Sequence, residues 1–409
     1  MRRTLAGLSL LVFSSAVPAF EAVDTIPYPS LGDYPAYPAP ERGPGTLYGQ
    51  FGVQRDDNVL RETTGEDSET IWRVGVGASY EARVYGRQRV LLEARGDGYK
   101  YNEFSDLDNF AYGVLGEWRW ELGNRLSGTL GYGRRQYQAD ISELQAAIED
   151  EITENHVYGT AALLFASRFR ARAGFDVVDG DRPSARDAEV RSSGLTAGVD
   201  YVSPLGNSLG IEVRRSDGDA AVPEELDPLG ILVDNDFEET EVAFVASYNP
   251  GPSLRLGARI GHTEREYSEL PERNFSGTTG RADIAWRPGN KTLLVLRVYR
   301  EPRSIIDVGA SHVLVEGVSF GPSWAPTAKL VFSARLINEH REYSGDPATA
   351  LDAEPLQDET VRGYVLAAGW EVTRRHHVGL AWEHGERSSN VLGRDYDYNT
   401  LMLNLRYVF

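Results

Sequence analysis

Residues 401–409 show the pattern that most constrains how this chain can fold. Every second position carries a large apolar or aromatic side chain: Leu401, Leu403, Leu405, Tyr407 and Phe409. The positions between them are mixed: Met402, Asn404, Arg406 and Val408. Because successive side chains of a β-strand point to opposite faces, this strand has two different environments. Lipid on one side and a wet lumen on the other would produce this pattern, with aromatic residues at the membrane interface.

The same residues suggest how such a strand reaches a membrane. Leu405, Tyr407 and Phe409 resemble the C-terminal signal that the barrel-insertion machinery reads in bacterial outer-membrane proteins. The alternative is a terminal strand of a soluble sandwich. The membrane interpretation is favoured because the pattern repeats along the rest of the chain.

From residue 46 onward the chain repeats one unit, a strand followed by a polar connection. Short connections such as 85–86 and 122–124 alternate with long ones such as 55–67 and 216–236. About eighteen such strands fit between residues 46 and 409, and outer-membrane barrels have even strand numbers, short periplasmic turns and long external loops. The predicted fold is an all-β, transmembrane, up-and-down antiparallel barrel. Closure would pair every backbone polar group that faces lipid.

Arginine decides which face of each strand points outward. Trp72, Val74 and Val76 alternate with Arg73, and Leu254, Leu256 and Ile260 alternate with Arg255 and Arg259. An Arg or Lys facing the bilayer midplane costs about 2–4 kcal/mol, so the arginine face is predicted to line the lumen.

Glu316 does not fit this alternation. It shares the apolar side of its strand with Leu314, Val318 and Phe320. Since a carboxylate among lipid-facing residues is unfavourable, we expect a bulge or a register shift at this position.

The predicted inner wall mixes bases and acids. The basic lumen-lining candidates are Arg95, Arg119, Arg135, Arg172, Arg214, Arg255, Arg259, Arg281, Arg297, Arg335 and Arg406. The acidic residues are Glu93, Asp97, Glu117, Asp176, Asp200, Glu212, Glu239, Glu241, Asp283, Glu339 and Glu383. Two interpretations are open. The charges form a salt-bridge ladder that holds the wall together, or the arginines line a conduit and bind carboxylates or sugar hydroxyls.

The first 45 residues fall into two segments. Arg2 and Arg3 precede an apolar stretch at 5–13 and small residues at 16–22, so residues 1–22 are predicted to be a secretory signal peptide. Residues 23–45 are rich in proline, which favours extended structure over sheet pairing. This segment is a periplasmic linker, a plug inside the lumen, or a docking tail for a periplasmic partner. The barrel is assigned to residues 46–409.

Composition limits the other classes of function. The net charge of -19 argues against general nucleic-acid binding. The chain has no cysteine, so disulfides, thiol catalysis and cysteine-ligated metals are excluded. The G-x-S-x-G spacing at 317–321 lies inside a predicted strand, 312–324, and not at a strand-to-helix elbow. No metal-ligating histidine spacing occurs, and no cofactor is expected. Asp56-Asp57-Asn58 could seat Ca²⁺ in an external loop, although such residues are commoner at turns without metal.

One motif points to a family. The stretch from Arg55 to Arg61, Arg-Asp-Asp-Asn-Val-Leu-Arg, resembles the D-x-N-V-x-R signature of outer-membrane β-barrel porins, including the EpsL-type proteins encoded with exopolysaccharide biosynthesis genes. Arg55 and Leu60 depart from the aromatic residues usual there. Further matching stretches are 99–101, 107–110, 118–120 and 128–132. The resemblance implies polysaccharide secretion across the outer membrane and supplies no catalytic residues.

These observations give three functional hypotheses for a protein of the outer membrane of a Gram-negative bacterium. The first is a porin-like channel that exports an exopolysaccharide or another polar solute, with membrane lipid and a periplasmic secretion partner around it. The second is a closed structural or adhesion barrel that acts through its external loops. The third is an outer-membrane hydrolase, which ranks last because no catalytic site is recognisable.

Overall fold

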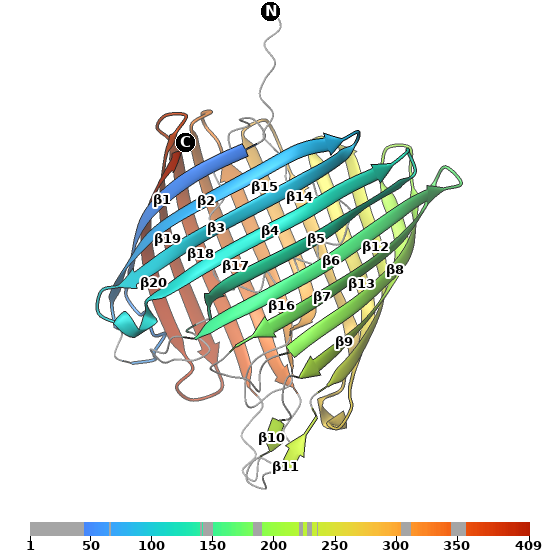
Figure 1. Cartoon of the computed structure of the whole chain (residues 1–409). Helices are drawn as coiled ribbons and strands as arrows, with labels where there is room; N and C mark the ends of the chain where they lie inside the picture. The colour runs from blue at the N-terminus through green and yellow to red at the C-terminus, as the bar shows by residue number, and fades with distance from the viewer. Residues whose placement is uncertain are drawn as a thin grey trace, which may run out of the picture.

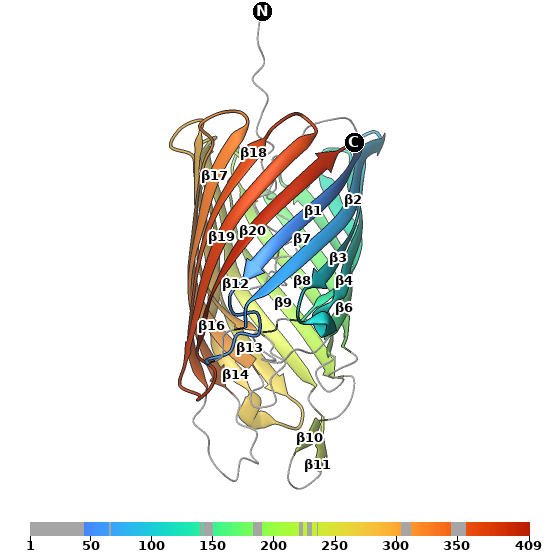
Figure 2. The ribbon, with the colours of Figure 1, turned by 90° about the vertical axis from the view of Figure 1, so that its left-hand side faces the viewer.

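The computed structural model describes residues 45–64, 67–139, 141, 150–182, 190–220, 224–226, 231–234, 236–303, 312–344 and 357–409. The predicted signal peptide, residues 1–22, lies outside the described residues, as does the proline-rich segment up to residue 44. The described residues form one closed sheet of 18 antiparallel strands and a separate two-stranded hairpin (Figures 1 and 2). The predicted barrel and its strand number are confirmed.

The first nine barrel strands are β1 (Gly45–Asp56), β2 (Glu69–Tyr85), β3 (Gln88–Tyr101), β4 (Asn109–Leu122), β5 (Leu126–Gln138), β6 (Glu151–Phe165), β7 (Phe169–Asp181), β8 (Val190–Val202) and β9 (Ser208–Ala220). The other nine are β12 (Phe237–Gly251), β13 (Leu254–Tyr267), β14 (Phe275–Trp286), β15 (Thr292–Arg303), β16 (His312–Trp324), β17 (Leu330–Ser344), β18 (Asp358–Glu371), β19 (His376–Ser389) and β20 (Tyr396–Val408). The long connections hold the hairpin of β10 (Glu224–Leu226) and β11 (Ile231–Val233) and the short 3-10 helices η2 (Ser105–Leu107) and η4 (Pro271–Arg273).

Closure joins the first strand to the last. β1 pairs with β2 on one side and with β20 on the other, from Tyr48 opposite Val408 to Asp56 opposite Thr400. β1 begins and β20 ends at the same end of the barrel, which also carries the short turns (Figure 1, top). The long connections lie at the other end, where the β10–β11 hairpin projects beyond the rim (Figures 1 and 2). We call these the turn side and the loop side.

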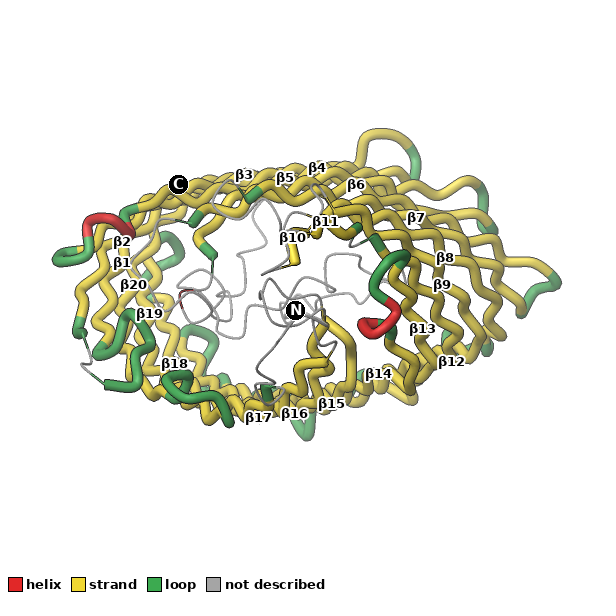
Figure 3. Tube along the Cα trace, turned by 90° about the horizontal axis from the view of Figure 1, so that it is seen from below, coloured by secondary structure: helices red, strands yellow, loops and turns green. Residues whose placement is uncertain are grey.

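The cross-section of the barrel is elongated. Seen along the axis, β3, β4 and β5 lie on one long side of the wall, and β15, β16 and β17 lie on the other (Figure 3). Residues on these two groups of strands therefore face each other across the narrow dimension of the barrel.

Side-chain exposure follows the predicted alternation. On β2, Val74 and Val76 are 61% and 62% exposed, whereas Arg73 between Trp72 and Val74 is 2% exposed. On β20, Leu401 is 52% exposed and Met402 is 5% exposed. The exposed apolar set forms the outer face, since inward arginines would otherwise lie in lipid. Among the described residues, no helix has the length and apolar character needed to cross a bilayer.

The expectation for Glu316 is wrong. The register of β15 and β16 runs without a shift from Thr292 opposite Trp324 to Arg303 opposite Val313. Glu316 stays on the outer face, where its carboxylate lies 2.8 Å from Nε of Arg300 on β15. This ion pair lies on the loop side of Val298 and Val318, beyond the apolar part of both strands. A cross-strand partner at the membrane edge satisfies the carboxylate, so no bulge is needed.

The assignment of faces can be tested by moving a charge. Val76→Arg places a guanidinium on the outer face near the middle of β2, and we expect it to lower the free energy of unfolding by about 2–4 kcal/mol. Urea titration in lipid vesicles, followed by tryptophan fluorescence, measures this change. Ser79→Arg, on the inner face of the same strand, is the matched control and should cost much less. Equal costs would contradict the assignment.

Candidate functional site

The inner wall is the candidate functional site, and the register places the predicted arginines on it. Their positions alternate with exposed apolar residues of the outer face on every strand concerned. These arginines are Arg95, Arg119, Arg135, Arg172, Arg214, Arg255, Arg259, Arg281, Arg297, Arg335 and Arg406. They differ in what they contact, and this difference decides which of them could meet a solute.

A chain of ion pairs ties neighbouring strands together on one side of the barrel. Arg172 on β7 donates to Asp200 on β8 at 2.8 Å and to Glu212 on β9 at 2.6 Å. Arg259 on β13 contacts Glu212 as well, and also Glu241 on β12 at 3.0 Å. Asp200 and Glu212 are 2% and 1% exposed. Buried carboxylates must be paired to be tolerated, so these arginines belong to the wall.

Five further predicted arginines are held in the same way. Each forms an ion pair with a carboxylate on its own or a nearby strand: Arg119 with Glu117, Arg135 with Glu154, Arg214 with Asp176, Arg281 with Glu301, and Arg297 with Asp283. In the last four pairs the nitrogen and oxygen atoms are 2.9, 2.7, 3.0 and 2.6 Å apart. The ladder interpretation therefore describes most of the basic set.

A second polar group lies near the seam between β1 and β20. Arg406 donates to the side chain of Gln50 at 3.2 Å and lies 4.5 Å from the ring centre of Tyr48. Gln50 also donates to Asp97 at 2.6 Å, and Asp97 accepts from Arg73 at 3.0 Å. Arg73 is among the largest fully buried side chains. The sequence placed it on the inner face, although it was not among the lumen-lining candidates. Its inward position was predictable, whereas its partner on β3 depends on the register.

Arg95 and Arg335 differ from the rest. Both side chains are exposed on the inner face, and among the described residues neither forms a salt bridge or a hydrogen bond. Arg95 on β3 stands opposite Gly77 and Gly113, and Arg335 on β17 stands opposite Val365. β3 and β17 lie on the two long sides of the cross-section (Figure 3). The barrel therefore presents, from each long side, an exposed cation that forms no described salt bridge.

Inner-wall tyrosines reach across glycines to glutamates. Tyr299 on β15 lies over Gly317 on β16, where a Cβ would come within 2.4 Å of its ring, and its hydroxyl donates to Glu339 on β17. Tyr158 on β6 crosses Gly131 on β5 in the same way and donates to Glu117 on β4. Each unit spans three strands in register. Sequence reasoning missed these units because no local spacing reveals which residues the register brings together.

The D-x-N-V-x-R motif fastens the first strand to the last. Asp57 accepts hydrogen bonds from the backbone N–H and the side-chain amide of Asn399 at 2.6 and 3.0 Å. Asn58 donates to the backbone carbonyl of Asp397 at 2.9 Å. Arg61 pairs with Asp56 at 2.8 Å and lies 3.5 Å from the ring centre of Tyr398. The motif thus joins β1 to β20 at the loop-side end of the barrel.

This arrangement bears on the Ca²⁺ site considered for Asp56-Asp57-Asn58. The Asp56 carboxylate accepts hydrogen bonds from Arg61 and Thr400, and the Asp57 carboxylate accepts from Asn399. Within the described ranges, no group of three histidines, aspartates or glutamates could hold a metal ion. The motif acts through protein contacts.

The tyrosine–glycine crossing yields a prediction. Gly317→Ala forces a methyl group into the ring of Tyr299, so we expect overpacking to lower the free energy of unfolding by about 1–3 kcal/mol. Urea titration in vesicles measures the effect. Gly321→Ala on the same face of β16 is the control, because its Cβ would meet nothing closer than 3.8 Å. A similar loss in both variants would show that the crossing is not responsible.

The contacts of the D-x-N-V-x-R motif yield a second prediction. Asp57→Ala removes the acceptor of both Asn399 donors, and a lost hydrogen bond to a charged group costs about 1.5–3 kcal/mol. We therefore expect faster amide hydrogen exchange in residues 57–64 and 396–400 with little change in distant strands. Asp106→Ala, an exposed carboxylate in η2, should leave this exchange unchanged. Unaltered exchange in Asp57→Ala would contradict the assigned role.

Part of the chain is similar to a known family, and the whole fold is similar to solved structures. Residues 245–409 match the model of a family described as "Putative beta-barrel porin 2". The outer membrane protein OpdK from Pseudomonas aeruginosa is similar in structure, with a TM-score of 0.48 and 11% identity over 89% of this chain and 99% of OpdK. OpdF from the same organism gives a TM-score of 0.49 and 12% identity over 89% of this chain and 97% of OpdF. No curated protein matches the sequence.

The family match concerns the second half of the barrel, from the middle of β12 to β20. The D-x-N-V-x-R motif and the other stretches that carry the EpsL-type resemblance lie before it. The two-faced wall is that of an outer-membrane β-barrel, and the match to the porin model covers only its second half. The match does not distinguish the EpsL type.

Proposed function

We propose that this barrel is an outer-membrane channel through which an exopolysaccharide leaves the cell. The observation that carries the proposal is that Arg95 and Arg335 are exposed on the inner face and form no described salt bridge. A guanidinium is a planar fork of donors that suits carboxylates and sugar hydroxyls. A polymer of acidic sugars would find such a donor on each long side of the barrel.

The size of the barrel supports passage of a polymer. Barrels of about 16–18 strands are wide enough to leave an aqueous channel, whereas barrels of about eight strands are filled by side chains. This barrel has 18 strands.

The distribution of charge supports passage as well. Most wall arginines are held by carboxylates, as Arg172 and Arg259 are by Glu212. Transport requires binding that is weak enough for release. A few free cations on an otherwise neutralised wall would provide binding of this kind along the path of the polymer.

The family resemblance supplies the class of cargo. EpsL-type proteins are encoded with exopolysaccharide biosynthesis genes, which favours a polysaccharide over a small solute. In this proposal the proline-rich segment, residues 23–45, lies at the periplasmic mouth and meets a secretion partner or the lumen.

Conductance across a planar bilayer tests the channel. We expect the purified barrel to conduct, or to conduct once residues 23–45 are deleted if that segment acts as a plug. A correctly folded barrel that stays silent in both forms would overturn the proposal.

The free arginines give a specific prediction. Replacing both, as Arg95→Gln and Arg335→Gln, removes two unpaired cations from the lumen, so the chloride-to-potassium permeability ratio should fall. The reversal potential in a KCl gradient measures it. Arg134→Gln is the control, because Arg134 lies on the outer face of β5, where it donates to Tyr112 at 3.0 Å. A ratio unchanged by the double substitution would exclude these arginines from the conduction path.

One observation favours the adhesion barrel as a second candidate. The β10–β11 hairpin extends beyond the loop-side rim (Figures 1 and 2). It belongs to the connection predicted at 216–236, which begins at residue 221 because β9 extends to Ala220. If the barrel acts through its loops, deleting residues 221–235 abolishes cell adhesion and leaves polymer export intact. The channel proposal expects polymer export to depend on the barrel and adhesion to be unaffected.

A further inference from the structure

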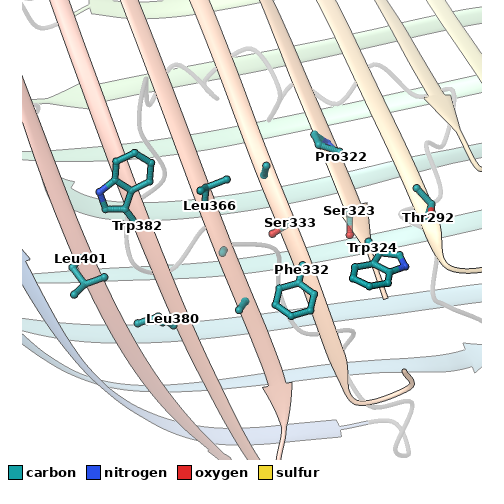
Figure 4. A pocket seen from close by; sticks show the side chains of 13 residues that line it. Thr292, Pro322, Ser323, Trp324, Phe332, Ser333, Leu366, Leu380, Trp382 and Leu401 are labelled. Carbon is teal, nitrogen blue, oxygen red and sulfur yellow. The ribbon is translucent and has the colours of Figure 1, made fainter. Parts of the chain in front are cut away.

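The outer face carries an apolar groove across β15 to β20, with a volume of about 540 Å³ (Figure 4). Trp324 and Phe332 form one wall, and Leu380 and Trp382 form the other. Ala334 and Ala368 are the small outward residues between them. The remaining lining residues are Thr292, Pro322, Ser323, Ser333, Leu366, Ala367 and Leu401. The groove is thus a hollow in the part of the wall that faces lipid.

The groove reaches the turn-side edge of the membrane. Trp324 is the last residue of β16 and Thr292 is the first of β15, so both lie beside the turns. Leu401 and Trp382 lie deeper, toward the middle of β20 and β19. A groove of this orientation runs from the headgroup level into the hydrocarbon layer.

Cations lie at the turn-side end of the groove. Lys291 directly precedes Thr292, and its Nζ donates to the carbonyl of Pro326 at 2.7 Å. Lys329 is in the next turn, and its Nζ lies 3.5 Å from the carbonyl of Val372. The chain has lysine only at positions 100, 291 and 329. Two of its three lysines therefore stand beside this groove.

These two cations have no carboxylate partner among the residues that the structure describes. Arg375, in the turn before β19, donates to the hydroxyl of Tyr407 at 3.3 Å and likewise forms no described salt bridge. Elsewhere on the turn side, Arg87 pairs with Glu121 at 3.3 Å and Arg89 pairs with Glu81 at 3.5 Å. Unlike Arg87 and Arg89, the cations of the rim beside the groove are therefore not paired with a carboxylate among the described residues.

We propose that this surface binds an anionic glycerophospholipid of the periplasmic leaflet. One acyl chain lies in the groove between Phe332 and Leu380, and the phosphate lies at Lys291 and Lys329. An acyl chain that fills the groove makes van der Waals contacts with the apolar side chains that line it, and an empty groove lacks these contacts. Basic residues at the membrane surface attract anionic headgroups, and long lysine side chains reach the interface while their stems stay on apolar surface.

The charge pattern favours lipid over a second copy of this chain. A two-fold contact through the groove would use the same surface on both copies and bring their turn-side rims together. Lys291 and Lys329 of each copy would then face like charges, which disfavours association. A phosphate supplies the opposite charge at the same place.

Native mass spectrometry of the full-length barrel tests the proposal. The protein is released from mixed micelles that contain equal amounts of phosphatidylglycerol and phosphatidylethanolamine, and retained lipids are counted. We expect the native chain to retain phosphatidylglycerol preferentially. Ala334→Leu with Ala368→Leu fills the groove and should abolish retention. Lys291→Gln with Lys329→Gln should retain lipid and lose the preference for phosphatidylglycerol.

Matched controls separate the site from general lipid contact. Ala171→Leu with Ala173→Leu adds the same volume to the outer face of β7, and Arg125→Gln removes a turn-side cation away from the groove; both should behave as the native chain. A heat-induced shift in electrophoretic migration equal to that of the native chain shows that each variant is folded. Equal retention by the native and groove-filled chains would overturn the proposal. So would equal retention of both lipids by the native chain, or a dimer that the groove-filling pair abolishes.

Discussion

The rest of this structure depends on one constraint, that backbone N–H and C=O groups inside a bilayer must be paired within the protein. Closure meets it by pairing β1 with β20, so the chain has no free sheet edge in lipid. Closure also fixes which side of each strand is inside, because the side-chain period along a strand is two residues. A slip of β20 by one residue against β1 would turn Arg406 outward and Leu405 inward. The hydrogen bonds from Asn399 to Asp57 stabilise the register at the place where a slip would begin.

The charged residues of the inner wall fall into two groups, those paired with an opposite charge and those exposed to the lumen. Where carboxylates are buried, as at Glu212, they accept from arginines of two strands and hold the wall together. Such pairs have low net value for stability but cannot be broken singly without leaving an uncompensated charge. Tyr299 and Tyr158 use other glutamates in the same structural way. Arg95 and Arg335, which are exposed and form no described salt bridge, are the cations proposed to meet an anionic solute.

The sequence predicted which face of the wall a side chain lies on, but it did not predict which residues contact one another. Alternation predicted the exposure of Val74 and the burial of Arg73, because both follow from a period of two and the cost of charge in lipid. The same reasoning failed at Glu316, since a periodic pattern does not show where the apolar belt ends and a polar rim begins. It could not find the Tyr299–Gly317–Glu339 unit or the Asp57–Asn399 contact. These depend on register between strands, and for Asp57 and Asn399 the partners are 342 positions apart.

The outer face has different chemistry at its two edges, and this difference fixes the barrel in the membrane. On the loop side, outward carboxylates stand beside bases, as Glu316 beside Arg300 and Asp358 beside His340 at 3.6 Å. On the turn side, Lys291 and Lys329 stand beside backbone carbonyls. Since moving one such cation into the bilayer midplane costs about 2–4 kcal/mol, charged residues at both edges prevent the apolar belt from sliding along the membrane normal. The turn-side cations are then held at the level of the periplasmic headgroups, where an anionic phosphate can neutralise them.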